Sequence, residues 1–142
     1  MAVELVRDLP EATLWVQAGE TRLRQVLGNL LANALDALTE KANPRKLWLS
    51  AERRDDYVYL TIRDNGPGFT SQAMAHAREP FFTTKTRTQG LGLGLAICDT
   101  LMRALGGELL LANHPEGGAL LTLQLRVAKP GANLQTSEDS RA

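Results

Sequence analysis

The stretch that decides the fold is residues 23–38, LRQVLGNLLANALDAL, which has the spacing of one amphipathic helix. Its apolar side chains recur at three- and four-residue intervals and form one wide stripe, which a helix buries against a core. Asn29, Asn33 and Asp36 stand at i, i+4 and i+7 and form a polar row beside that stripe. Asparagine is a poor helix former, because its amide competes for main-chain hydrogen bonds. The row is therefore either an ordinary solvent-facing set or a set that converges on a ligand or a cation.

Length, charge and cysteine content limit what the chain can be. Its 142 residues are enough for one domain with a real core. The 16 basic and 16 acidic residues cancel, so no sequence-wide charge favours binding to nucleic acid or to an anionic membrane. The single Cys98 excludes an internal disulfide and lies in an apolar run, where a small buried thiol is favoured over a nucleophile. No apolar run has membrane-spanning length and no signal peptide is present, so we expect a soluble chain in a reducing compartment.

The remaining pattern predicts strands in hairpins with helices between them. Alternating or short apolar runs predict strands at residues 3–8, 13–17, 46–53, 57–63, 108–112 and 119–127. The central helix is expected to be capped by Thr21 and to break at Pro44, and a second helix is expected at residues 93–105. This order favours one sheet with helices on one face, a two-layer α/β sandwich that spans residues 1–128.

Two stretches lack a regular pattern. Residues 70–89 contain a proline, a phenylalanine pair and several Thr, Arg and Lys, a composition that suits a mobile lid better than a packed element. Residues 129–142 are small and polar, so we expect a disordered C-terminal tail.

Two glycine-containing motifs indicate a phosphate- or nucleotide-binding site. Asp64 ends a predicted strand and begins DNGPGF, where a strand-end carboxylate can accept a hydrogen bond from an amine such as that of adenine. The same letters also make an ordinary tight turn. GLGLGLAI, residues 90–97, places three alternating glycines before a helix, whose first N–H groups attract phosphate. Its spacing fits neither a Rossmann fingerprint nor a P-loop, and its leucines argue against a flexible linker.

Four motifs together resemble the ATP-binding domain of sensor histidine kinases. NLLANALDA resembles the asparagine box of that family, DNGPGF the first glycine box, EPFFTTK the phenylalanine box and GLGLGLAI the second glycine box. The four motifs follow the family's order within residues 21–97. The sequences of NALDA and EPFFTTK are most similar to those of nitrogen-regulatory and C4-dicarboxylate sensor kinases. The resemblance implies the Bergerat fold shared with DNA gyrase, the Hsp90 chaperone and mismatch-repair ATPases, with ATP held between the central helix and a lid.

The resemblance also implies a role for each matching residue. Asn33 would coordinate Mg²⁺ through its side-chain oxygen, which suits that hard cation, and Asn29 would assist catalysis at the phosphates. Asp64 would accept from the adenine amine. The other residues expected at the nucleotide are Asp36, Gly66, Gly68, Phe69, Thr83, Thr84, Lys85, Gly90, Leu91, Gly92, Leu93, Gly94 and Leu95. Phe81 or Phe82 would pin the lid or dock on a partner domain.

The chain departs from the family's patterns at three places. Gyrase-type ATPases carry a water-activating glutamate where Asn29 stands, so its absence favours phosphate transfer to a side chain over fast hydrolysis. Many sensor kinases have Lys-Tyr where this chain has Asp36-Ala37, which places that phosphate contact in doubt. Many also use a threonine at the position of Ala119 for a water-mediated adenine contact, and alanine cannot supply it.

The chain offers no suitable phosphate acceptor. His76 falls in the expected lid and His114 in a hairpin loop, and neither has the helical His-Glu-x-x-x-Pro-like setting of the family's phosphorylated residue. We therefore expect the catalytic domain alone, taken from the cytoplasmic side of an inner-membrane, homodimeric receptor. The acceptor histidine would lie on a separate helical dimerisation domain, with a response regulator downstream and no nucleic-acid partner. The alternatives are a protein-serine kinase of the anti-sigma-factor type and a degenerate, non-catalytic nucleotide-binding or interaction module.

Overall fold

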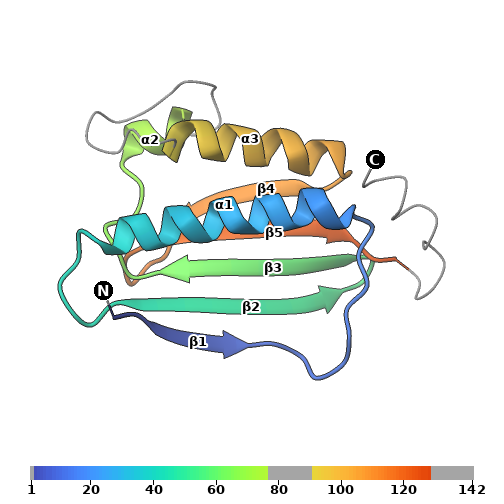
Figure 1. The fold of residues 1–142 in the computed structure, drawn as a ribbon, viewed down its shortest axis with the longest axis horizontal. Coiled ribbons are helices and arrows are strands. Elements are labelled where there is room, and N and C mark those ends of the chain that lie inside the picture. The colour runs from blue at the N-terminus through green and yellow to red at the C-terminus, as the bar shows by residue number, and fades with distance from the viewer. Residues whose placement is uncertain (1, 77–90, 129–142) are drawn as a thin grey trace.

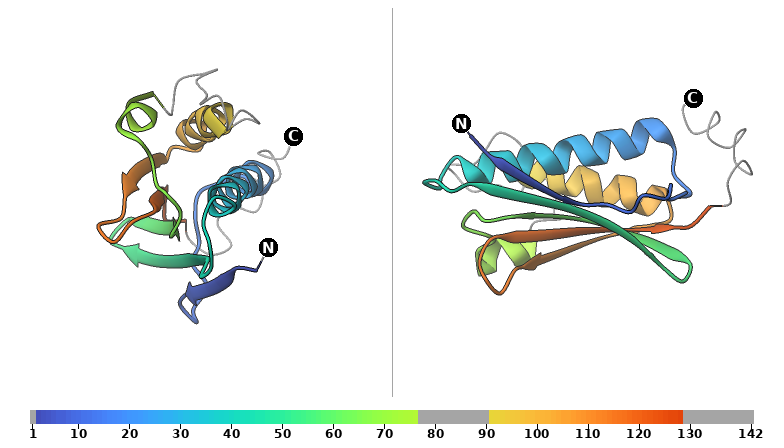
Figure 2. Two further views of the ribbon diagram at one scale, coloured as in Figure 1. Left: turned by 90° about the vertical axis from the view of Figure 1, so that its left-hand side faces the viewer. Right: turned by 90° about the horizontal axis from the view of Figure 1, so that it is seen from below.

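The computed structural model describes residues 2–76 and 91–128, and within them five strands form one sheet in the order β1-β2-β3-β5-β4. The strands are β1 (Glu4–Asp8), β2 (Lys46–Arg54), β3 (Tyr57–Asp64), β4 (Glu108–Asn113) and β5 (Ala119–Arg126), and the helices are α1 (Glu20–Leu38), α2 (Ser71–His76) and α3 (Leu91–Ala104). Helices α1 and α3 lie side by side over one face of the sheet, and none of the described residues forms a helix over the opposite face (Figures 1 and 2). The expected two-layer α/β sandwich is confirmed. No helix in these two ranges has the length and apolar character needed to cross a membrane.

The sheet is mixed, and its one parallel pair positions α1. Strands β1 and β2 are parallel, with Glu4 opposite Lys46 and Asp8 opposite Ser50, while the other neighbouring pairs are antiparallel. A parallel pair requires a crossover connection, and α1 lies within this one. The crossover brings the last turn of α1 back to the end of the sheet where β2 begins and β3 ends (Figure 1).

The core lies between this sheet face and the two long helices. On α1 the buried positions fall four residues apart, on the apolar stripe that the sequence predicted; they are Val26, Leu30, Ala34 and Leu38. On β5 every second residue is buried, which directs Leu121, Leu123 and Leu125 toward the helices. Each buried leucine contributes roughly 2 kcal/mol of transfer free energy, so this seam fixes α1 over the sheet.

Two local expectations near the start of the chain are wrong. Residues 13–17 do not form a strand; they make a single antiparallel bridge between Val16 and Val127. Strand β5 is already bonded to β3 on one edge and to β4 on the other, so only the residues past its end are left to pair. Helix α1 begins at Glu20 with Gly19 as its N-cap and no side-chain cap, so Thr21 does not cap it. The N–H of Leu23 bonds to the carbonyl of Gly19, and Glu20 pairs with Arg24 at 2.7 Å.

The segment expected to be a lid begins with ordered structure. Ser71–His76 form the short helix α2, where the Ala73 N–H donates to Oγ1 of Thr70 at 3.0 Å. A threonine in this position caps a helix, and this helix was not predicted from the sequence. The rest of that segment and the tail at residues 129–142 lie outside the described residues. Helix α3 begins at Leu91 instead of residue 93, because leucines between the glycines favour helix propagation.

Candidate nucleotide site

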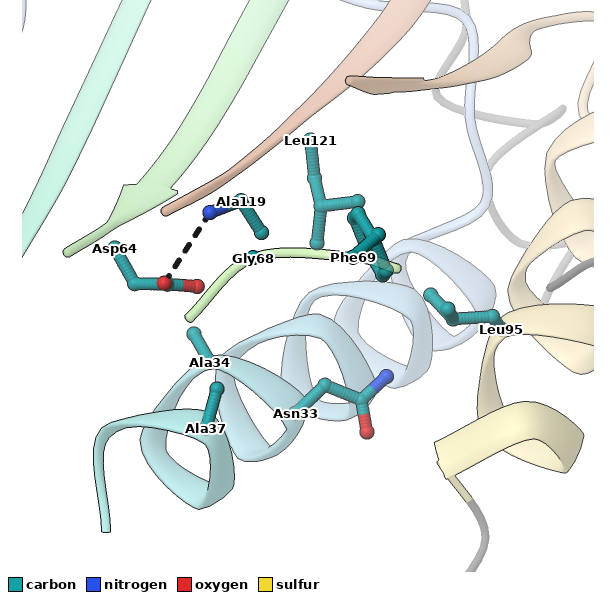
Figure 3. Close-up of a pocket in the computed structure, with 9 residues that line it drawn as sticks. All are labelled: Asn33, Ala34, Ala37, Asp64, Gly68, Phe69, Leu95, Ala119 and Leu121. Carbon is teal, nitrogen blue, oxygen red and sulfur yellow. Dashed lines mark hydrogen bonds between the residues drawn. The ribbon is translucent and has the colours of Figure 1, made fainter. Parts of the chain in front are cut away.

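A pocket of about 410 Å³, measured out to its open mouth, lies between α1 and the adjoining ends of β3 and β5 (Figure 3). It is lined by Asn33, Ala34, Ala37, Asp64, Gly68, Phe69, Leu95, Ala119 and Leu121. Most of these side chains are apolar, and the two that carry polar groups, Asp64 and Asn33, stand at different ends of the pocket (Figure 3). Apolar walls with a few fixed polar groups are typical of small-molecule sites.

Asp64 is the buried polar group at one end of the pocket. It closes β3 on the helix-facing side of the strand and is only 2% exposed. Its Oδ1 accepts hydrogen bonds from the N–H of Gly66 at 2.8 Å and from the N–H of Ala119 at 3.3 Å. These main-chain donors fix the carboxylate, which faces α1 near Ala34 and Ala37 (Figure 3). A fixed acidic acceptor between apolar walls can satisfy the amine of a planar base.

The two glycines of the DNGPGF turn have different roles. A Cβ at position 66 would lie 3.1 Å from Oδ1 of Asp64 and 3.2 Å from the carbonyl oxygen of Ala37, so Gly66 lets the turn approach α1. Gly68 lines the pocket and has φ +79, a conformation that side chains rarely adopt. Gly66 therefore serves the packing of the turn, while Gly68 is the glycine at the pocket wall.

Asn65 holds the same turn from its other side. Its Oδ1 accepts from the N–H of Lys46 at 2.8 Å, and its Nδ2 donates to the carbonyl of Pro44 at 3.0 Å. The loop that leads out of α1 is thereby tied to the turn that carries Asp64. A side-chain amide suits this contact because it donates and accepts at once.

The three residues of the polar row on α1, Asn29, Asn33 and Asp36, have different environments in the structure. Asn33 lines the pocket and extends toward Leu95 of α3, and its Nδ2 is buried without a hydrogen-bond partner (Figure 3). Asn29 is half-buried and hydrogen-bonds the thiol of Cys98 on α3. Asp36 is exposed and does not line the pocket. Of the three, Asn33 is the side chain whose polar group is left for a ligand.

Cys98 is a packing residue between α1 and α3, as the sequence predicted. It is fully buried, and its Sγ lies 3.7 Å from the carbonyl oxygen of Val26. Burial raises the pKa of the Cys98 thiol from 9.0 to about 11, although the hydrogen bond with Asn29 lowers it in part. A thiol that stays protonated at neutral pH is a poor nucleophile.

A magnesium ion fits this pocket only if most of its ligands are phosphate oxygens and water molecules. In the part of the chain that the structure describes, no three His, Cys, Asp or Glu side chains come together to hold a metal. Mg²⁺ commonly takes one or two protein oxygens, phosphate oxygens and several waters. The buried Nδ2 of Asn33 has no protein partner, and as a donor it suits a phosphate oxygen, while the Oδ1 of the same amide is the atom that could ligate Mg²⁺. The residues present therefore fit a Mg²⁺ ion carried in on phosphates.

The expected phosphate-binding residues are only partly within the described ranges. Leu91–Gly94 form the first turn of α3, and Leu95 in the next turn lines the pocket. The first N–H groups of a helix attract anions, so this turn suits phosphate. The others predicted to contact nucleotide, Thr83, Thr84, Lys85 and Gly90, together with Phe81 and Phe82, lie outside the described residues.

Sequence reasoning missed several residues of the site. Ala34 belongs to the apolar stripe of α1 and Leu121 to the alternation of β5, so each carried only a core signal, and Ala37 was noted only as a departure from the family's Lys-Tyr. Ala119 lacks the family's threonine side chain, but its N–H still reaches Asp64. Asn113, at the end of β4, bonds the main chain of Phe69.

Comparison with known proteins gives a family and several relatives. The family model described as histidine kinase-, DNA gyrase B-, and HSP90-like ATPase matches residues 18–129. The C4-dicarboxylate transport sensor protein DctB of Pseudomonas aeruginosa is 64% identical over all 142 residues, which are 23% of that protein. The two-component sensor PprA of the same organism is 40% identical over 91% of the chain and 14% of its own length. The chain thus spans less than a quarter of either relative.

Solved structures share the arrangement of helices and strands. The nucleotide-free catalytic domain of the histidine kinase ThkA matches with a TM-score of 0.75 and 28% identity, over 87% of this chain and 80% of that one. Full-length ShkA in complex with AMPPNP matches with a TM-score of 0.70 and 30% identity, over 93% of this chain and 27% of that one.

Proposed function

We propose a function for this chain on the basis of its family. The chain belongs to the histidine kinase-, DNA gyrase B- and HSP90-like ATPases, in their sensor histidine kinase branch. It binds Mg²⁺–ATP in the pocket beside α1 and donates the γ-phosphate to a histidine on a separate helical dimerisation domain. One observation carries the proposal: Asp64, 2% exposed and held by two main-chain N–H groups, faces an apolar pocket that also contains the unpartnered Nδ2 of Asn33.

The two ends of the pocket suit the two ends of a nucleotide. Asp64 accepts from the amine of adenine, and Ala34, Ala37 and Phe69 provide apolar surface for the base. Asn33, beside the first turn of α3, faces the phosphates. Full-length ShkA, which shares this fold over 93% of the chain, was solved in complex with AMPPNP, and this supports an adenine nucleotide as the ligand.

Asn33 would hold Mg²⁺ through its amide oxygen, and the ion would neutralise charge on the phosphates. Thr83, Thr84, Lys85 and the glycines at 90, 92 and 94 would complete the phosphate end, with Asn29 assisting through its place on the same helix. Phosphoryl transfer depends mainly on positioning and charge stabilisation. The chain's part is to orient the γ-phosphate toward an acceptor on another domain, since position 29 carries no carboxylate to activate water.

The proposed partners follow from the relatives' names. The sensors DctB and PprA are longer proteins, and this chain matches only a portion of each. We place the domain on the cytoplasmic side of an inner-membrane, homodimeric receptor, where it would phosphorylate the helical domain and so serve a response regulator.

The test combines the chain with radiolabelled Mg²⁺–ATP, alone and with the helical acceptor domain of its receptor added in trans. Alone, the chain should bind ATP, hydrolyse it very slowly and keep no label. With the partner, acid-labile and base-stable phosphohistidine should appear on the partner. Acid-stable label on serine would indicate a serine kinase of the anti-sigma-factor type, and absence of ATP binding a degenerate module. Label on His76 or His114 would overturn the proposal of a separate acceptor.

A further inference from the structure

Asn113 makes a two-point contact with the main chain of Phe69. Its Oδ1 accepts from the Phe69 N–H at 2.8 Å, and its Nδ2 donates to the Phe69 carbonyl at 2.9 Å. This is the pairing that an adjacent strand would offer, made here by one side chain at the end of β4, 44 residues away in sequence. Only a side-chain amide combines a donor and an acceptor in this arrangement.

The residue held in this way forms part of the pocket wall. Phe69 lines the nucleotide pocket on one side (Figure 3). On the other side Phe69 and Asn113 line a second, shallow and open hollow, together with Met74 and Ala75 of α2. The hydrogen bonds between Asn113 and Phe69 thus lie between the nucleotide pocket and the start of α2, which begins at Ser71.

The turn that carries Phe69 depends on such a contact. Residues 65–70 belong to no helix or strand, so their main chain has no ladder of hydrogen bonds. Gly68 has φ +79, and a Cβ there would lie 2.8 Å from Oδ1 of Asn113. Glycine loses more conformational freedom on ordering than other residues. The amide of Asn113 is what fixes this flexible position against β4.

We propose that Asn113 is a positioning residue for nucleotide binding. It sets the place of Phe69, and with it one wall of the base pocket and the start of α2. The inference rests on the proposed function, because the ligand is taken to be an adenine nucleotide. Asn113 does not line the pocket itself and acts on the ligand through Phe69.

The test measures ADP and adenosine affinity by calorimetry for the wild type, Asn113→Ala and Asn113→Asp, at a temperature where circular dichroism shows every variant folded. Asn113→Ala should weaken both ligands by a similar factor of about ten, as expected for losing one to two neutral hydrogen bonds. Equal loss for adenosine is the signature of a base-wall effect, because adenosine lacks the phosphates. Asn113→Asp should lose at least as much, because its second oxygen faces the Phe69 carbonyl.

The matched control is His114→Ala, at the next position of the same hairpin. His114 Nδ1 accepts from the Glu116 N–H at 3.0 Å within the hairpin, so the control removes a hydrogen bond that does not involve Phe69. Its ligand affinities should equal those of the wild type. Wild-type affinity in Asn113→Asp, which keeps the shape of the side chain, would mean that Asn113 only fills space and would overturn the inference. If the wild type binds neither ligand, the proposed function fails and this inference fails with it; if all variants bind alike, only the role of Asn113 fails.

Discussion

The main-chain N–H of Ala119 donates to Oδ1 of Asp64 at 3.3 Å and joins the first residue of β5 to the last residue of β3. The residue before it, Gly118, is buried, and a Cβ at that position would collide with the carbonyl oxygen of Asp64. The carboxylate proposed to select adenine is therefore oriented from a hairpin 55 residues further along the chain.

Gly118→Ala tests this contact, and Gly117→Ala is its matched control. Both glycines have positive φ, +93 and +100, so both alanines carry a main-chain strain of about 1 kcal/mol. A Cβ at position 117 meets nothing within 4 Å, whereas one at position 118 must displace the Asp64 carbonyl. We expect Gly118→Ala to lower the unfolding free energy by about 1–3 kcal/mol more than Gly117→Ala in urea titrations, and to weaken ADP binding as well. Equal losses for the two variants would contradict the geometry.

Asp64→Asn should weaken ADP binding by about ten- to a hundredfold, because a buried hydrogen bond to a charged acceptor contributes roughly 1.5–3 kcal/mol. The wild type should also prefer ADP over GDP, since guanine presents a carbonyl where adenine presents its amine. Asp8→Asn is the control, because Asp8 also ends a strand but is exposed and distant from the pocket. Calorimetry that finds equal affinity for ADP and GDP would refute the assignment of Asp64 to the base.

Asn33→Ala should separate ligand binding from stability. It removes a buried Nδ2 that has no partner, whereas Asn29→Ala removes the amide that interacts with the thiol of Cys98. Both substitutions gain the same helix propensity, because alanine is a better helix former than asparagine. Without nucleotide, Asn33→Ala should therefore be the more stable of the two, by up to about 1 kcal/mol. Its ATP affinity should lose its dependence on Mg²⁺, while adenosine binding should stay near wild type. Parallel losses for ATP and adenosine would instead assign Asn33 a structural role.

The buried thiol of Cys98 predicts a pH dependence of stability. Its pKa is 9.0 when unperturbed and about 11 in the folded protein, so the unfolded chain releases the proton first as pH rises. The resulting stabilisation is complete below pH 9 and is lost between pH 9 and 11, by up to about 1.4 kcal/mol per pH unit. The difference in unfolding free energy between the wild type and Cys98→Ala should shrink over this range. A difference that is constant from pH 8 to pH 11 would exclude the shift.

The periodicity of apolar residues predicted those helices and strands that bury one face and expose the other. The stripe of α1 and the alternation of β3 and β5 each identify one buried face, and these faces are buried in the structure, whereas on β2 only Leu47 is buried. The expected strand at 13–17 failed because pairing depends on which edges remain free, and β5 has neighbours on both sides. That β1 lies beside β2 and parallel to it also follows from the whole sheet and from no local pattern.

The pocket could be predicted where a residue carries a chemical signal. Asn33, Asp64 and Phe69 were placed by their motifs, and all three line the pocket. Ala119 was identified only as a missing threonine, because its main-chain N–H carries no side-chain signal, and Asn113 carried no signal because its contact is 44 residues away. Asn29 and Asn33 look equivalent on the helix, and only the packing of α3 gives one the thiol of Cys98 and leaves the other facing the pocket.

Strand β1 shields the β2 edge from other molecules. It is five residues long and mostly exposed, and it pairs with β2 from Lys46 to Ser50. The family match begins only at residue 18, so a protein trimmed to that match would lose β1 and leave this stretch of β2 without a neighbour. A bare sheet edge is a template for strands of a second molecule. With β1 in place, the edge of the sheet is this short strand, whose charged residues Glu4, Arg7 and Asp8 make it a poorer template than the longer β2.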